Sequence, residues 1–434
     1  MNELLVIWGE WIKPSAGLAT VQWSVLLALA AAAGHLIQRY TGLPKVIGYS
    51  VIGAFAGLAG FTGAIWPLQG TSLFLLELGV AVVLFEAGGR ISLRWFRHNP
   101  MVLVQSLAES TLTVIAVYWA LKLMGMRDAV AQPLALLAMA ASPAVLSRVL
   151  MDTRASGPVS ERAMVLSTMS TLYALTLCSA SASAGILNGG SNALSSISFH
   201  NTVYPIFLVL GMSFVVGAVM ALTLRLALRV MNPTSENTAI LLLALIAIGA
   251  ALSAHFGGSA PLASLLGGLL LKHLNIRPWS WPRQMGTASS MLTMLMFVLV
   301  SVVAAQAEWA GPITGLVLAM IAARAVAKIA GVSLGNIGSG SSAKQALLVG
   351  FAMTPMSSVA LLLVSQFITA SPTLGKHIAG VALPAILVME ILGAVLTTVA
   401  IYRAGESSKP WMLSQRAAVS ATPSATSREP VHES

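Results

Sequence analysis

Long apolar stretches recur along the chain, and short segments with charged and turn-forming residues separate them. A helix needs about 20 mainly apolar residues to cross a lipid bilayer. The stretches cover residues 21–38, 44–60, 72–88, 101–121, 129–146, 162–186, 203–224, 237–254, 260–271, 287–305, 311–332, 344–369 and 378–402. The pattern predicts an all-α polytopic membrane protein with about 13 transmembrane helices.

The basic residues divide unequally between alternate loops. Of the 24 Lys and Arg residues, 18 fall in the C-terminal segment and in the loops that lie on its side of the membrane, and 4 fall on the other side. The remaining two, Arg324 and Lys328, lie inside the stretch 311–332. Basic loops face the cytoplasm. We therefore expect an external segment at 1–20, a transmembrane domain at 21–403, and a cytoplasmic tail at 404–434 that is disordered because it is rich in Ser, Thr and Pro.

Composition narrows the function classes. Hydrophobic residues make up 57% of the 434 residues and charged residues only 9%, against about 25% charged in soluble domains. This excludes a soluble globular enzyme, and an enzymatic function is not expected. The net charge of +10 follows from the basic loops and does not indicate nucleic-acid binding. The single cysteine, Cys178, and the scattered histidines predict no metal site and no cofactor.

Two stretches contain a proline after a hydroxyl residue. Pro143 follows Ser142, and Pro355 follows Thr354 at an offset of 212 residues. Leu84-Phe85 and Met296-Phe297 are related by the same offset. The paired stretches lie seven helices apart and would run in opposite directions, which is typical of inverted-repeat transporters. The pattern predicts inverted repeats with two crossed broken helices around an ion site, although two ordinary proline kinks would give the same residues.

Several ordered motifs resemble those of monovalent cation/proton antiporters, the sodium/hydrogen exchanger-like proteins, in their Kef-like branch. They are Leu43-Pro44 with Gly48-Tyr49, Leu84-Phe85-Glu86-Ala87-Gly88, Ser259-Ala260-Pro261-Leu262, Lys328-Ile329-Ala330-Gly331 and Met389-Glu390-Ile391-Leu392-Gly393. The resemblance covers about residues 20–406. It implies exchange of Na⁺ or K⁺ for protons by alternating access, a homodimer in the bilayer, and a location in the bacterial inner membrane.

The chain departs from this family at the ion site. The resemblance implies an aspartate nine or ten residues after Arg162, where this chain has Thr171 and Leu172, with Ser170 beside them. It also implies that Lys328 approaches that acid. With Thr171 neutral, Lys328 would pair with another carboxylate, stay deprotonated, bind an anion, or extend toward the cytoplasmic surface.

Ionisable residues at membrane depth are functional candidates because each costs about 2.5–3.5 kcal/mol on insertion scales. We expect Arg324 or Lys328 to pair with Glu86 or Glu390, and Glu109 to pair with an unidentified base. For Glu86 and Glu390, a purely structural role is the alternative to a role at the ion site. Hydroxyl groups near the breaks are candidate ligands for a dehydrated cation, although such residues also serve in helix packing. These hydroxyl residues are Ser142, Ser170, Thr171, Thr354, Ser357 and Ser358.

The sequence thus supports a cation/proton antiporter, with two alternatives from other classes. One is a non-transporting sensor or partner subunit that keeps the fold. The other is an organic-anion carrier that uses the cationic core. If exchange occurs, we expect it to be weak or electroneutral, because Thr171 offers a cation only a neutral oxygen.

Overall fold

The computed structural model describes residues 16–93, 96, 99–187, 199–231, 235–275, 283–307, 309, 311–356 and 358–408. This part of the chain is helical and contains no strand. Its helices are α2 (Ala16–Thr41), α3 (Lys45–Leu58), α4 (Gly70–Arg90), α6 (Met101–Leu123), α7 (Asp128–Met139), α8 (Pro143–Thr153), α9 (Pro158–Leu187), α10 (Phe199–Val230), α11 (Glu236–His255), α12 (Ala260–Leu274), α13 (Arg283–Ala305), α14 (Gly311–Leu334), α15 (Ala343–Ala352), α16 (Ser358–Ala370) and α17 (Pro372–Ala404).

Each predicted apolar stretch falls on one helix or on a pair of consecutive helices. Ten helical stretches in the described residues are long and apolar enough to span a membrane. Large apolar side chains also point outward at helical spacing, as Val215, Val219, Leu222 and Leu226 do along α10. The all-α polytopic membrane fold is confirmed, whereas the count of 13 crossings remains a prediction.

The two proline-containing stretches are broken where the sequence predicts. The first forms α7 and α8, with residues 140–142 outside any helix, and Ser142 caps α8 by accepting a hydrogen bond from the Val145 amide at 3.3 Å. Pro143 suits the first position of α8 because that position needs no amide donor. The second stretch forms α15 and α16, with 354–356 non-helical. Ser357 lies outside the described residues.

The same order of elements occurs twice. After α4 come a helix (α6), a broken pair (α7–α8) and a long helix (α9). After α13 come a helix (α14), a broken pair (α15–α16) and a long helix (α17) in the same order. Close helix packing repeats in the same way, since α4 packs on α12 and α13 packs on α3. The backbones of α4 and α12 nearly touch, because a Cβ on Gly268 would stand 2.0 Å from the Phe85 carbonyl oxygen.

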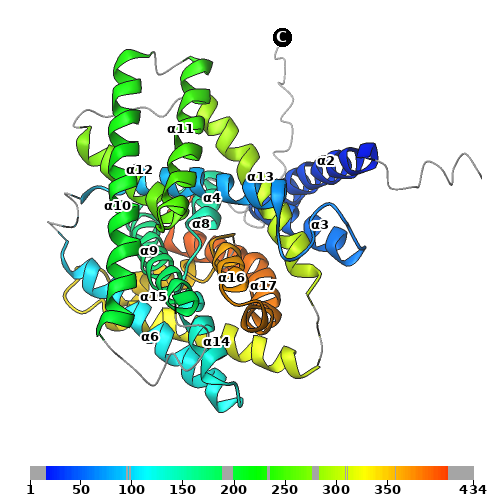
Figure 1. Cartoon of the computed structure of the whole chain (residues 1–434). Coiled ribbons are helices and arrows are strands. Elements are labelled where there is room, and N and C mark those ends of the chain that lie inside the picture. The colour runs from blue at the N-terminus through cyan, green and yellow to red at the C-terminus, as the bar shows by residue number, and fades with distance from the viewer. Residues whose placement is uncertain are drawn as a thin grey trace, which may run out of the picture.

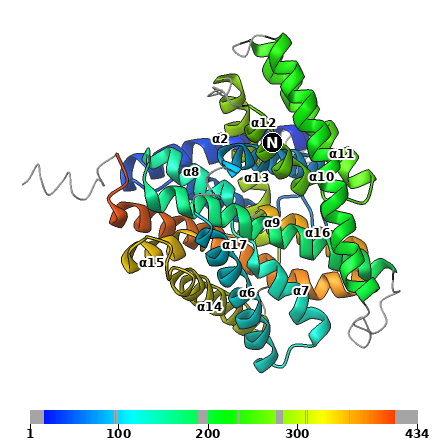
Figure 2. The same cartoon turned by 90° about the vertical axis from the view of Figure 1, so that its left-hand side faces the viewer.

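The helices form two groups, which we name the site bundle (α6–α9 and α14–α17) and the flanking bundle (α2–α4 and α10–α13). In Figure 1, α2–α4 and α11–α13 lie in the upper part of the molecule, and α6 and α14–α17 lie in the lower part. The turned view in Figure 2 keeps α6, α14 and α15 on the opposite side from α2 and α12. The bundles meet where α17 packs on α3 and α13.

The ends of the chain lie largely outside the described residues. Residues 1–15 and 409–434 are not among the described residues, so most of the predicted external segment and most of the predicted tail have no structural description. The first tail residues pack on the α8–α9 connection. The Glu406 carboxylate accepts hydrogen bonds from the Val159 and Ser160 amides, both at 2.7 Å. The division into an external segment, a transmembrane domain and a tail remains a prediction.

Candidate functional site

Arg324 of α14 joins the two helix breaks. It is 1% exposed, and its guanidinium donates to four backbone carbonyls. Nε donates to Ala138 at 2.8 Å, Nη2 to Ala140 at 2.8 Å and to Pro355 at 3.1 Å, and Nη1 donates to Thr354. These carbonyls lie at the ends of α7 and α15, where helix dipoles are negative. The two breaks are therefore close in space, as predicted, and the arginine satisfies their backbone.

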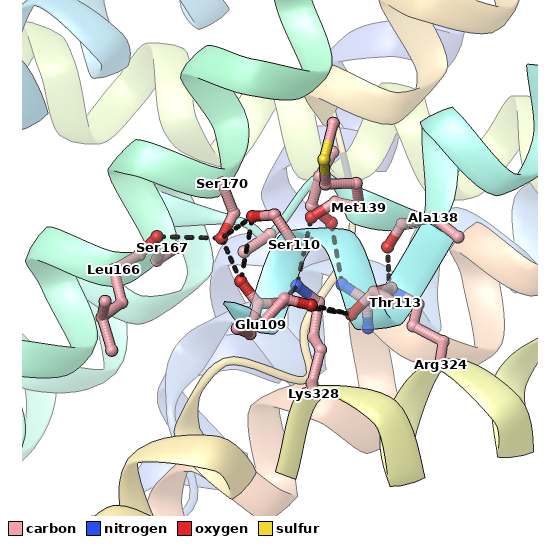
Figure 3. Close-up of polar contacts among 12 residues, drawn as sticks. Glu109, Ser110, Thr113, Ala138, Met139, Leu166, Ser167, Ser170, Arg324 and Lys328 are labelled. Atoms are coloured by element: carbon pink, nitrogen blue, oxygen red, sulfur yellow. Dashed lines mark hydrogen bonds and ion pairs between the residues drawn. The ribbon is translucent and has the colours of Figure 1, made fainter. Parts of the chain in front are cut away.

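Lys328 lies one helical turn after Arg324 and is fully buried. Its Nζ forms an ion pair with the Glu109 carboxylate of α6 and donates to the Met139 carbonyl at 3.1 Å. Figure 3 shows the ammonium between this carboxylate and the end of α7. The expectation that one of the two bases pairs with an acid is confirmed. The expectation that the acid is Glu86 or Glu390 is wrong, because Glu109 pairs with Lys328, while Glu86 pairs with Arg90 and Glu390 bonds to serine hydroxyls.

Hydroxyl groups surround the Glu109 carboxylate. Ser170 of α9 donates to Oε2 at 2.6 Å, and Ser110 also reaches Oε2, at 3.2 Å. Thr113 lies 3.3 Å from Oε1. Figure 3 shows these side chains directed at the carboxylate from α6 and α9. The carboxylate is thus held by oxygen-bearing groups of the kind that replace the hydration shell of a cation.

The ion pair depends on a close crossing of α6 and α14. A Cβ on Gly331 would stand 2.4 Å from the Cα of Glu109, so only glycine lets the two backbones approach this far. Lys328 lies within one turn of Gly331 and therefore meets Glu109 across the crossing. Because α6 and α14 occupy equivalent places in the two repeats, the acid and the base come from corresponding helices.

The remaining hydroxyl candidates bond to the backbone around the breaks. Thr171 is buried and donates to the carbonyls of Ala141 at 3.1 Å and Ser167 at 2.7 Å. Thr354 donates to the Phe351 carbonyl at 2.8 Å. Ser142 caps α8, and Ser358 is buried at the start of α16. Among the predicted hydroxyl residues that the structure describes, Ser170 contacts the ion pair directly, through its bond to Glu109.

The other two candidate acids bond to other groups. Glu86 forms a salt bridge with Arg90 at 2.7 Å and accepts a hydrogen bond from Ser289 at 3.0 Å. Glu390 accepts hydrogen bonds from Ser50 and Ser301. Among the described residues, no group of three or more His, Cys, Asp or Glu side chains lies together as a metal site would require.

Glu109 is the central residue that the sequence reasoning did not select as a site candidate, although it expected a basic partner for it. A usable signal is present in the sequence. Glu109 lies near the middle of the stretch 101–121, with Ser110 beside it and Thr113 one turn away. A carboxylate at membrane depth with neighbouring hydroxyls is a typical setting for an ion site.

A polytopic all-α chain, with two broken helices joined by a buried arginine and a buried ion pair one turn away, belongs to the class of secondary transporters. The profile of the family described as sodium/hydrogen exchanger, transmembrane, matches residues 25–403. The chain therefore belongs to the sodium/hydrogen exchanger family. No curated protein matches the chain in sequence.

The fold is similar to that of MjNhaP1, a sodium proton antiporter from Methanocaldococcus jannaschii. A structure of MjNhaP1 at pH 8 aligns with a TM-score of 0.63 and 18% identity, and it covers 89% of this chain and 98% of that one. A structure from electron microscopy aligns with a TM-score of 0.67 and 16% identity, over 92% and 100% of the two chains. At this identity the likeness establishes the fold alone.

Proposed function

We propose that the protein exchanges a monovalent cation, Na⁺ or K⁺, for protons, and that Glu109 and Lys328 couple the two. The observation that carries this proposal is the fully buried ion pair, which bonds to the end of α7 and lies one helical turn from Arg324, the residue that bonds to both helix breaks. A buried pair is a poor source of stability, because desolvation of both charges offsets their attraction. A functional reason for keeping it is therefore expected, and membership of the exchanger family supports that reason.

The pair offers cation and proton a common binding group. A cation that enters displaces the Lys328 ammonium from the Glu109 carboxylate, and Lys328 then releases its proton to water. The hydroxyls of Ser110, Thr113 and Ser170 supply further oxygen ligands. On the opposite side the cation leaves, Lys328 takes up a proton, and the ion pair forms again.

This scheme predicts electroneutral exchange. The proton-loaded site contains Glu109⁻ and Lys328⁺, with no net charge. The cation-loaded site contains Glu109⁻, the cation and neutral Lys328, which also sum to zero. One proton moves for each cation, and membrane voltage drives neither half of the cycle. In this scheme Glu109 on α6 supplies the negative charge that Thr171 lacks.

Alternating access requires the site to open to each side in turn. In our proposal the site bundle moves relative to the flanking bundle, carrying the helix breaks with Arg324 and the ion pair as one unit. The same proposal includes a homodimer in the bacterial inner membrane with its C-terminus in the cytoplasm. The basic loops and the family membership support this arrangement.

Reconstituted vesicles with an internal pH dye test the proposal. We expect an outward Na⁺ or K⁺ gradient to move the internal pH, and Glu109→Gln to abolish this response. Glu77→Gln is the matched control. It makes the same substitution in an apolar helix, α4, but at an exposed acid outside the proposed exchange site. A silent wild type would favour the non-transporting subunit. A response that depends on added organic anions, and not on the cation, would favour the anion carrier.

A further inference from the structure

Glu390 is a fully buried acid that the proposed exchange site does not use. It lies in α17 of the site bundle. Its Oε1 accepts hydrogen bonds from Ser50 at 2.5 Å and from Ser301 at 3.1 Å. Ser50 belongs to α3 and Ser301 to α13, which are both in the flanking bundle. The Glu390 carboxyl group therefore links the two bundles at the place where α17 packs on α3 and α13.

Among the residues that the structure describes, no base forms a salt bridge with Glu390. The helices that pack on α17 carry titratable or charged groups of their own, which are Lys45 and Tyr49 on α3, Asp128 on α7, Arg148 and Asp152 on α8, Glu161, Arg162, Tyr173 and Cys178 on α9, Arg283 on α13, Arg324 and Lys328 on α14, and Lys344 on α15. Arg324 and Lys328 are bonded elsewhere, and Arg148 lies 3.6 Å from Asp152. In the described part of the chain, the Glu390 carboxyl group accepts hydrogen bonds from the Ser50 and Ser301 hydroxyls and takes part in no salt bridge.

The second oxygen of the carboxyl group is buried and has no hydrogen-bond partner among the described residues. An ionised carboxylate buried without a counter-charge is strongly unfavourable, and such groups become neutral instead. A carboxylic acid fits the contacts, because its carbonyl oxygen accepts the two serine hydrogens while its other oxygen holds the proton. These contacts favour the protonated form of the Glu390 carboxyl group over the ionised form.

We propose that Glu390 is a second proton-binding site, and that its proton controls the contact between the two bundles. With the proton bound, the carboxyl group is neutral and bonds to Ser50 and Ser301 across the contact. When the proton leaves to water, a negative charge remains between apolar helices with no base beside it. That charge favours an arrangement in which the bundles separate locally and water reaches the carboxylate.

Infrared spectroscopy of the purified protein tests the bound proton. At neutral pH, wild type is expected to show the carbonyl stretch of a buried protonated carboxyl group, with a shift in heavy water. Glu390→Gln should lack this band. Glu109→Gln should keep it, because the ion-paired Glu109 is a carboxylate and does not contribute. A wild type without the band, or a band that survives in Glu390→Gln, would overturn the inference.

Ser50→Ala provides a second measurement that does not depend on replacing the acid. It removes the nearer hydroxyl donor to the Glu390 carbonyl, so the same band should move to higher frequency. An unchanged band in this variant would place the protonated carboxyl elsewhere. The infrared result is independent of the proposed exchange site, since Glu109→Gln can lose or keep transport without affecting it.

The pH dependence of exchange tests the link to movement. Glu390→Gln keeps an acceptor for both serines but cannot ionise. At alkaline pH the wild-type carboxyl group loses its proton, whereas the glutamine side chain is unchanged. We therefore expect the wild-type exchange rate to fall on the alkaline side of its optimum and the rate of the variant to be at least twofold higher there. Superimposable pH profiles would show that the Glu390 proton plays no part in the movement of the bundles.

Discussion

Replacing Arg324 by lysine should destabilise the protein although the charge is retained. The guanidinium donates to four carbonyls at two helix breaks from three nitrogen atoms. A lysine ammonium has three hydrogens on one nitrogen, and we expect it to reach one break and lose at least two of these bonds. Hydrogen bonds to charged groups contribute about 1.5–3 kcal/mol each. The expected loss in the free energy of unfolding is therefore about 3–6 kcal/mol.

Denaturant or thermal unfolding of the detergent-solubilised variants measures this loss. Arg324→Met should be more severe, because it leaves four buried carbonyls unpaired at about 1–3 kcal/mol each, which approaches the whole stability of a typical protein. Arg39→Lys is the control, since Arg39 is exposed at the end of α2. If Arg324→Lys unfolds within about 1 kcal/mol of wild type, the bridging role assigned to Arg324 is wrong.

Three further substitutions test the site and its surroundings. Thr171→Asp in a Glu109→Gln background should recover part of the lost exchange in the vesicle assay, because it returns an acid to the neighbourhood of the helix breaks; no recovery would argue against that placement. Gly331→Ala should lower the melting temperature and the exchange rate, since its Cβ would stand 2.4 Å from the Glu109 Cα, whereas Gly380→Ala has open space and should behave as wild type. Glu406→Gln should increase amide hydrogen exchange at the start of α9, because it weakens the charge-assisted bonds to the amide groups there; unchanged exchange would mean that the contact contributes little.

The helices were predictable because a transmembrane helix depends on local composition. The breaks were predictable because Pro143 and Pro355 act on their own backbone. The two basic residues of the site were also evident, since a charge inside an apolar stretch is visible in the sequence. The partner of Lys328 was not evident, because it depends on which helices lie side by side.

Glu109 illustrates this limit. It precedes Lys328 by 219 residues, and no local pattern says that α6 and α14 cross closely enough for the two side chains to meet. The resemblance to antiporters directed attention to Thr171 on α9, the family's usual position for the acid. Gly331 allows the backbone of α14 to pack against Glu109. That Gly331 faces Glu109 becomes known only from the fold.

Our proposal requires that a cation and a proton compete for the Glu109–Lys328 pair. It is tested most directly by measuring proton release when Na⁺ or K⁺ is added to the purified protein in weakly buffered detergent solution. We expect wild type to release about one proton per cation bound, and Glu109→Gln to release none. Cation binding without proton release, or equal release by Glu109→Gln, would contradict it.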